Sequence, residues 1–260
     1  MILRPAERVN GRISLQRADV TALVPVWTHE GRSLGQADVC AYEIEGRRFV
    51  VKDFRPRPWL IRRGWGRWVL RREWNRLERL QGIVGIPRLL GWVDGDAFAM
   101  EWIVGERLPH SRHGVLEPPF FERLERLVAE MHARGVAHGD LRRKNVLADR
   151  DQRPYLIDFA TAHLTGANFL RRRLFERICR IDRLKIIELK ADYCPNALTE
   201  DERRSLEDRP LSLRLGHFAR KKLYRPFIKP SRWRRRWKRL RALLFGRRPE
   251  GQGPPEDRSR

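Results

Sequence analysis

The sequence predicts an α+β fold, with strands in the first hundred residues and helices in most of the rest. Residues 37–45 (ADVCAYEIE) and 47–54 (RRFVVKDF) have strand-like composition, and the Glu45-Gly46-Arg47 segment between them suits a hairpin turn. Residues 67–80 and 118–134 instead repeat apolar side chains at helical spacing. Prolines begin the second helix, and Gly135 follows its end.

Composition indicates a folded chain with an anionic partner. The 260 residues suffice for one two-lobed domain or two small ones, and 41% of them are hydrophobic. The formal net charge of +23 points to anionic lipid, nucleic acid or a phosphorylated substrate. Nucleic acid is the least favoured of these, because no binding motif accompanies the charge. The oligomeric state stays open.

The cysteines and the apolar segments predict a cytoplasmic protein. Cys40, Cys179 and Cys194 are odd in number and lack metal-ligand spacing, so we expect free thiols in a reducing compartment. Neither a signal-peptide core nor a run of about 18 apolar residues is present in the sequence. Peripheral attachment to a surface remains compatible with this pattern.

Residues 136–160 (VAHGDLRRKNVLADRDQRPYLIDFA) carry the candidate chemistry. His138, Asp140 and Asn145 follow one apolar segment in the order H-x-D-x-x-x-x-N, and a second apolar run delivers Asp158. Two acids and an amide in this arrangement suit phosphoryl transfer, with Asp140 orienting a hydroxyl and Asn145 and Asp158 holding Mg²⁺. Taken singly, each acid is better explained as a solvated turn or a helix cap.

The segments HGDLRRKN (138–145) and IDFA (157–160) resemble the catalytic core of the protein-kinase-like superfamily. The resemblance implies a two-lobed fold with a small β-rich N-lobe (1–103) and a mainly helical C-lobe (104–208). It also implies ATP and Mg²⁺ as cofactors, with Asp140 accepting the proton of the acceptor hydroxyl. Arg142 stands where kinases often carry a lysine that neutralises the transferred group, although Arg143 or Lys144 could serve instead.

Lys52 interrupts a buried β-branched run and therefore needs an anionic partner. It could also be an edge-strand lysine that prevents aggregation. By resemblance, Lys52 contacts the nucleotide phosphates and pairs with a glutamate of the following helix. Glu73 fits this position best, since Glu78 points elsewhere on the helix.

The nucleotide-covering loop departs from the kinase pattern G-x-G-x-x-G-x-V. Arg32, Leu34 and Ala37 stand where glycines are expected, and only Gly31 and Gly35 lie nearby. Gly35 could still let the loop close over phosphates through backbone N–H groups. This departure argues against an ordinary eukaryotic-type protein kinase.

Residues 97–103 resemble the kinase hinge. By this match the Glu101 carbonyl and the Ile103 N–H face the adenine, and Met100 lines the back of the pocket. One more core strand is the alternative. In the second lobe, the resemblance gives His138 a structural role near Asp158. Asp182 either fastens the backbone of the catalytic loop from below or pairs with a neighbouring arginine.

The segment after IDFA passes directly into a helical pattern and contains no A-P-E, so a peptide-docking platform is missing or reduced. Within the superfamily the chain resembles the bacterial lipopolysaccharide core (Kdo and heptose) kinases. That implies phosphorylation of a sugar hydroxyl on a glycolipid at the inner face of the cytoplasmic membrane. The alternatives are a Ser/Thr protein kinase with a minimal activation segment and a pseudokinase that acts as a binding module.

Two basic stretches complete the chain. Residues 55–66 (RPRPWLIRRGWG) predict a connection that packs its tryptophans locally or meets acidic substrate or lipid headgroups. Residues 209–248 hold sixteen Lys or Arg and no acid, with Trp233, Trp237, Leu240 and Leu244 at helical spacing. This extension either lies in an anionic membrane interface or packs on the second lobe. We expect residues 249–260 to be disordered.

Overall fold

The computed structural model describes residues 8–9, 12–13, 15–109 and 116–207. The chain divides into two units, Met1–Arg214 and Leu215–Arg260, and all described residues belong to the first. The expectations for residues 209–260 therefore lie outside the described residues. Among the described residues, no helix has the length and apolar character needed to cross a bilayer.

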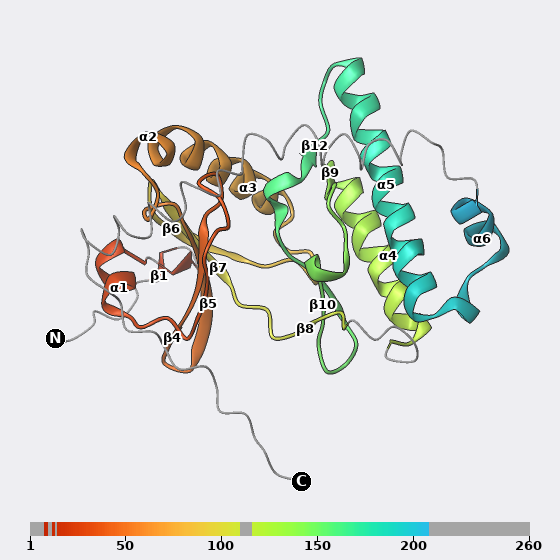
Figure 1. The fold of residues 1–260 in the computed structure, drawn as a ribbon, viewed down its shortest axis with the longest axis horizontal. Coiled ribbons are helices and arrows are strands. Elements are labelled where there is room, and N and C mark those ends of the chain that lie inside the picture. The colour runs from red at the N-terminus through yellow and green to blue at the C-terminus, as the bar shows by residue number, and fades with distance from the viewer. Residues whose placement is uncertain (1–7, 10–11, 14, 110–115, 208–260) are drawn as a thin grey trace, which may run out of the picture. The chain divides into compact units, whose positions relative to one another are not determined.

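A five-stranded antiparallel sheet dominates the N-lobe, in the order β3-β4-β5-β7-β6 (Figure 1). Its strands are β3 (Trp27–His29), β4 (Asp38–Ile44), β5 (Arg47–Asp53), β6 (Leu89–Asp94) and β7 (Ala97–Glu101). The predicted hairpin is β4–β5, and positive φ angles at Glu45 (51°) and Gly46 (72°) form its two-residue turn. A further short hairpin, β1 (Arg8–Val9) and β2 (Arg12–Ile13), precedes the sheet.

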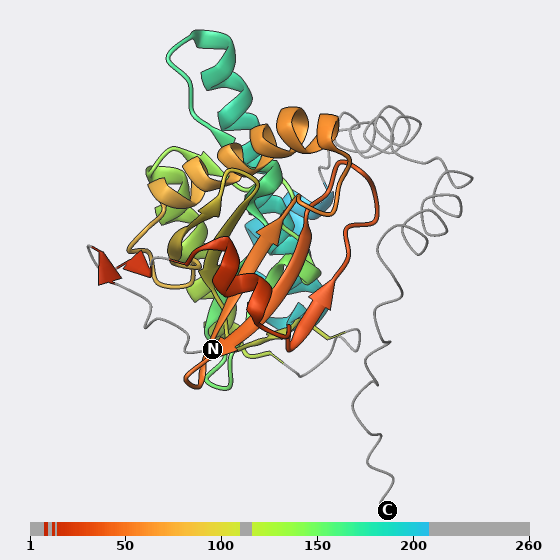
Figure 2. The ribbon, with the colours of Figure 1, turned by 90° about the vertical axis from the view of Figure 1, so that its left-hand side faces the viewer.

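Alternation along the strands gives this sheet two buried faces. One face packs on α1 (Arg17–Ala22), which lies in front of the sheet in Figure 2. That side includes Leu15, Val20, Phe49, Val51, Ala97 and Ala99. The other face, with Val50, Phe98 and Met100, joins a core cluster that continues through helix α3 into the C-lobe. Lys52 points to this second face by the period of two.

The basic connection at residues 55–66 is helical from Trp59 onward, which corrects the expected loop. α2 (Trp59–Ile61) runs into a π-helical turn (Arg62–Gly66) and then into α3 (Arg67–Arg79). Pro58 stands just before this helix, where a missing N–H costs nothing. Gly66 faces the ring of Phe54, and a Cβ there would approach that ring to 2.8 Å. The close packing explains why the wide turn ends at a glycine.

The C-lobe is mainly helical, as predicted. α4 (Pro118–Ala133) packs beside α5 (Phe169–Tyr193), and α6 (Glu200–Glu207) follows (Figure 1). Thr199 caps α6, accepting the N–H of Glu202 at 3.2 Å, as its sequence indicates. Two small sheets join the catalytic segments. The first contains β8 (Glu106–Arg107), β10 (Val146–Ala148) and β11 (Pro154–Leu156). The second contains β9 (Val136–Ala137) and β12 (His163–Leu164). Short 3₁₀ turns lie at Arg143–Asn145, Phe159–Thr161 and Pro195–Ala197.

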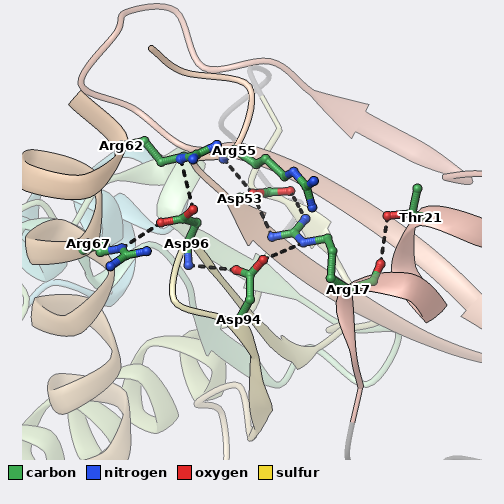
Figure 3. A network of polar contacts seen from close by, with 8 residues as sticks. All are labelled: Arg17, Thr21, Asp53, Arg55, Arg62, Arg67, Asp94 and Asp96. Carbon is green, nitrogen blue, oxygen red and sulfur yellow. Dashed lines mark hydrogen bonds and ion pairs between the residues drawn. The ribbon is translucent and has the colours of Figure 1, made fainter. Parts of the chain in front are cut away.

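An ion-pair network fastens the edge of the N-lobe (Figure 3). Arg17 of α1 contacts Asp53 at 2.5 Å and Asp94 at 2.7 Å, which joins the ends of β5 and β6. Next along the chain, Asp96 holds Arg62 at 3.0 Å and Arg67 at 2.8 Å. These contacts fix the start of the α2–α3 helix against the β6–β7 turn.

Candidate active site

Lys52 and Glu73 form a buried ion pair at the centre of the N-lobe, as predicted. Lys52 lies on β5 and Glu73 on the facing side of α3, and their exposed fractions are 8% and 2%. The Lys52 ammonium donates to the Glu73 carboxylate. Burial alone would lower the pKa of Lys52, but Glu73 and Asp158 outweigh it and raise this pKa. Glu73 and Asp158 therefore favour the charged form of Lys52.

Arg76 ties α3 to the C-lobe, a role that the sequence analysis missed. It lies three residues after Glu73, and its buried Nε donates to the carbonyl of Ala162 at 2.5 Å. Ala162 closes the 3₁₀ turn that follows Asp158. Arg76 therefore holds the helix that carries Glu73 next to the segment that carries Asp158. The one signal in the sequence is an arginine on the same helical face as Glu73.

Asp182 fixes the backbone of the catalytic loop, which confirms the first of its two predicted roles. Its side chain is fully buried and accepts the N–H of His138 at 2.7 Å and of Gly139 at 2.9 Å. His132 approaches the same carboxylate at 3.1 Å. Gly139 has a φ of +70°, and a Cβ at this position would meet His163 at 3.2 Å. The glycine of the HGD segment is therefore required by backbone conformation and by packing.

His138 has a structural position, as the resemblance implied. Its ring is fully buried, lies 5.0 Å from the Phe159 ring and contacts the carbonyl of Ile157 at 3.1 Å. It thereby links the loop that bears Asp140 to the segment that bears Asp158.

Asp140 and Asn145 lie side by side. The Asn145 amide donates to the Asp140 carbonyl at 2.8 Å and to its carboxylate at 3.2 Å. These bonds leave the Asn145 Oδ1 as the amide atom suited to a metal ion. Arg142 contacts the same Asp140 carboxylate at 2.7 Å. Arg142, the first of the three cations considered for this position, is thus paired with Asp140.

Asp158 lies across the cleft from Lys52. Its Oδ1 is 3.9 Å from the lysine ammonium, and half of its side chain is exposed. Burial would raise the pKa of Asp158, but the charges of Lys52, His138 and Arg142 outweigh it and lower this pKa. The residue adopts a left-handed backbone conformation with φ of 68°. Such a conformation in a non-glycine residue is strained and is common at functional sites.

The backbone brings Asn145 and Asp158 together. Strands β10 and β11 begin and end next to these residues and pair in register, with Val146 opposite Leu156. The N–H of Ile157 then donates to the Asn145 carbonyl at 3.0 Å. Two oxygen ligands, an amide and a carboxylate with a lowered pKa, therefore approach the same side of the cleft. This donor set fits Mg²⁺, which prefers oxygen.

The nucleotide-covering loop between β3 and β4 folds into turns. Gly31 donates its N–H to Asp38 at 2.8 Å, and Arg57 pairs with the same carboxylate. The carbonyl of Gly35 accepts the indole N–H of Trp65 at 3.1 Å, so Gly35 packs against the π-helical turn. Its predicted contact with a nucleotide stays a prediction.

The predicted hinge is the end of β7 and the segment after it. Met100 is buried in the core that joins the lobes, and the Glu101 carboxylate pairs with Arg88 at 3.2 Å. Ile103 is half-buried in the extended segment after the strand. The backbone contacts predicted for Glu101 and Ile103 stay predictions.

An ammonium paired with a helical glutamate and lying beside Asp158 of the other lobe is the arrangement of a kinase-type site. The described residues thus have a protein-kinase-like fold.

Comparisons with known proteins give the family. The family model "RIO domain" matches residues 49–181, just over half of the chain, and the chain belongs to the RIO domain family. A curated relative, the probable SapB synthase of Streptomyces coelicolor, is 33% identical over 140 residues. That match covers 45% of this chain and 15% of the relative.

Solved structures of Rio2 kinase from Chaetomium thermophilum are also similar. Its ADP/Mg²⁺-phosphoaspartate complex has a TM-score of 0.48 at 17% identity, covering 67% of this chain and 57% of that one. A second Rio2 structure has a TM-score of 0.49 at 17% identity, covering 68% and 60%. The chain therefore spans less than two thirds of the length of each of these relatives.

Proposed function

We propose that this protein transfers the γ-phosphate of ATP to a hydroxyl group of an acidic glycolipid at the cytoplasmic face of a membrane. The observation that carries the phosphotransfer is that Lys52, Asp140, Asn145 and Asp158 lie in one region. Lys52 is 3.9 Å from Asp158, Asn145 is 3.2 Å from Asp140, and the bond from the Ile157 N–H to the Asn145 carbonyl joins the two pairs.

Each residue has a separate task in the reaction. Lys52 binds the nucleotide phosphates, and Glu73 keeps its ammonium in place. Asp140 accepts the proton of the acceptor hydroxyl as the new bond forms. Arg142, which already contacts Asp140, offsets negative charge on the transferred group. Asn145 and Asp158 would hold Mg²⁺, which supplies positive charge between the phosphates when bound.

The charge around Asp140 supports an anionic acceptor. The side chains of Arg32, Arg107, Arg142 and Lys144 are exposed. Burial and the positive charges of Arg142, Arg32 and Arg107 lower the pKa of Lys144, although Asp140 opposes them. Cations that repel one another in this way gain stability when an anion lies between them. An acidic sugar or a phosphorylated glycan supplies such an anion.

The segment after Asp158 supports a non-peptide acceptor. Ten residues, 159–168, separate Asp158 from the first residue of α5. They form a 3₁₀ turn and the short strand β12, which pairs with β9. Typical protein kinases carry an activation segment here, between D-F-G and A-P-E, and this chain lacks the A-P-E. The Ser/Thr protein kinase reading is therefore less well supported.

The test uses the purified chain with Mg²⁺ and ATP labelled on its γ-phosphate, offered a glycolipid extract and a protein extract in parallel. We expect label in the glycolipid fraction with the wild-type chain and none with Asp140→Asn. Label confined to proteins would favour the Ser/Thr kinase. Nucleotide binding without transfer to either extract would favour the pseudokinase and refute the proposed reaction.

A further inference from the structure

Four large apolar side chains are exposed along the α2–α3 helix. Their exposed fractions are 56% for Trp59, 74% for Leu60, 46% for Trp65 and 47% for Trp68. We call these four residues the tryptophan patch. Exposed apolar side chains gathered in one place often mark an interaction site, whereas isolated ones are common on any protein surface.

The tryptophan patch lies in a cationic stretch of chain. Residues 55–72 contain seven arginines and no Asp or Glu. Arg63 and Arg72 cover the rings of Trp59 and Trp68, with guanidinium-to-centroid distances of 5.6 and 4.5 Å. Arg55 and Arg71, the latter on the same helix, are exposed.

Other arginines of this stretch hold it in place. Arg62 and Arg67 pair with Asp96 of the β6–β7 turn, as Figure 3 shows. Arg57 pairs with Asp38 at the start of β4. The stretch is therefore anchored to the sheet by some of its arginines, while Arg55, Arg63 and Arg71 present their charge to the solvent.

A second patch of the same kind begins α5. Phe169, Leu170 and Leu174 have exposed fractions of 67%, 77% and 51%, and we call them the leucine patch. Residues 169–180 contain five arginines and one acid, Glu176, which contacts Arg172 at 3.3 Å. The guanidinium of Arg173 lies 4.9 Å from the centroid of the Phe169 ring.

The two patches come from helices on the same side of the described residues. In Figure 1, α2 and the first turns of α5 both reach toward the top of the view. Figure 2, turned about the vertical axis, shows the same end of the molecule from another side. Both helices therefore lie toward one end of the described residues.

We propose that the tryptophan patch and the leucine patch together dock this protein on an anionic lipid bilayer. Aromatic and aliphatic side chains surrounded by arginines are typical of interfacial segments, whose apolar groups enter the acyl boundary while their cations meet the headgroups. The inference goes beyond the phosphotransfer reaction and does not depend on the identity of its acceptor.

Other occupants fit the charge less well. A second copy of the chain would bring one arginine-rich surface against another. The C-terminal stretch 209–248, with its sixteen cations and no acid, would be repelled in the same way. Nucleic acid matches the charge, but Leu60, Leu170 and Leu174 offer neither a stacking plane nor a hydrogen bond to bases.

The test is vesicle flotation of the full chain, because the basic extension could also bind lipid. Vesicles contain either neutral lipid alone or about 30% anionic lipid. We compare the wild type with Trp59→Ser/Leu60→Ser and with Leu170→Ser/Leu174→Ser. Because these side chains are exposed, the variants should fold, and their circular dichroism and melting curves verify this. Val24→Ser/Val84→Ser is the matched control, since these valines are 85% and 84% exposed, the first after α1 and the second between α3 and β6.

We expect both patch variants to lose about tenfold or more in affinity for anionic vesicles, since each deletes two exposed apolar side chains that would enter the bilayer. The control and Asp140→Asn should bind like the wild type, and neutral vesicles should bind weakly. Patch variants that float like the wild type would overturn the proposal. So would equal binding to neutral vesicles, or variants that lose affinity for a DNA duplex but keep it for vesicles.

Discussion

The two halves of the candidate active site differ in burial. On the N-lobe side, Lys52 and Glu73 are withdrawn from solvent and form a closed ion pair. On the C-lobe side, the Asp158 side chain is half exposed and that of Asp140 is 21% exposed. The buried half is set before any nucleotide arrives, whereas the open half remains accessible to a metal ion and an acceptor. Substitutions in the first half should therefore affect stability, and those in the second should affect chemistry.

The largest expected effect is on turnover, from the open half. Replacing Asp140 with asparagine removes the proton acceptor while keeping the side-chain shape. We expect kcat to fall by about a hundredfold to ten-thousandfold. Nucleotide affinity and melting temperature should stay near the wild-type values.

The matched control for this variant is Asp151→Asn in the β10–β11 turn, whose side chain is 70% exposed. Steady-state kinetics on the wild type, Asp140→Asn and Asp151→Asn measure the expected loss of kcat. Equal turnover in Asp140→Asn and the wild type would exclude Asp140 as the base.

The next largest effect is on stability, from the buried half. Lys52→Met leaves the Glu73 carboxylate buried without its ammonium partner. Breaking a buried pair in this way costs about 3 to 5 kcal/mol in the free energy of unfolding. The double variant Lys52→Met/Glu73→Gln should recover most of this loss, because no lone charge remains. Urea unfolding measures both changes.

The control pair is Lys185 and Glu188, whose side chains are 32% and 28% exposed. Lys185→Met should cost less than about 1 kcal/mol. If Lys52→Met cost no more than this control, the Lys52–Glu73 pair would not be the closed, desolvated pair described above.

A smaller effect is expected from Asp182, which supports the open half from below. Asp182→Asn keeps an acceptor for one backbone N–H but turns the other half of the side chain into a donor. The free energy of unfolding should fall by about 1 to 3 kcal/mol. Because the His138–Gly139 backbone loosens, kcat should fall while the KM for nucleotide changes little. An unaltered kcat in a folded Asp182→Asn protein would show that the Asp182 hydrogen bonds do not support catalysis.

The smallest expected effect is that of pH on the buried pair. The raised pKa of Lys52 means that its contribution to stability is fully present below its ordinary value of 10.5 and is lost only as pH rises through the higher folded value. The stability difference between wild type and Lys52→Met/Glu73→Gln, which leaves no lone buried carboxylate to titrate, should therefore be constant from about pH 7 to pH 10. Urea unfolding across this range tests it, and a difference that shrinks between pH 7 and pH 9 would contradict the assignment.

Much of the site follows from local pattern. The break that Lys52 makes in a β-branched run marked it as a residue in need of an anionic partner, whereas its pairing with Glu73 was implied by the kinase resemblance. The resemblance of HGDLRRKN and IDFA to the kinase catalytic core implied the roles of Asp140, Asn145 and Asp158. Alternation and helical periodicity are local properties, so they can be recognised in the sequence without knowledge of the fold.

The features that the sequence did not reveal depend on long-range packing. The sequence does not predict the helix through residues 59–66, because glycines within it and prolines just before it disfavour a helix. Its π turn is fixed by contact with Phe54. Arg76 is one of many arginines until Ala162 is brought to it across 86 positions. Arg17 joins two strand ends that no spacing rule connects. The two arginine-rich apolar patches, at Trp59–Trp68 and Phe169–Leu174, likewise lie far apart in the sequence and are related only in the structure.

The central claim is that Lys52, Asn145 and Asp158 meet at one metal-bound nucleotide. Calorimetric titration of a non-hydrolysable ATP analogue, with and without Mg²⁺, tests it directly. Mg²⁺ should strengthen binding to the wild type and to Asp140→Asn, and should have no effect on Asp158→Asn. Lys52→Met should bind weakly in both conditions. A Mg²⁺ effect that persists undiminished in Asp158→Asn would contradict the account.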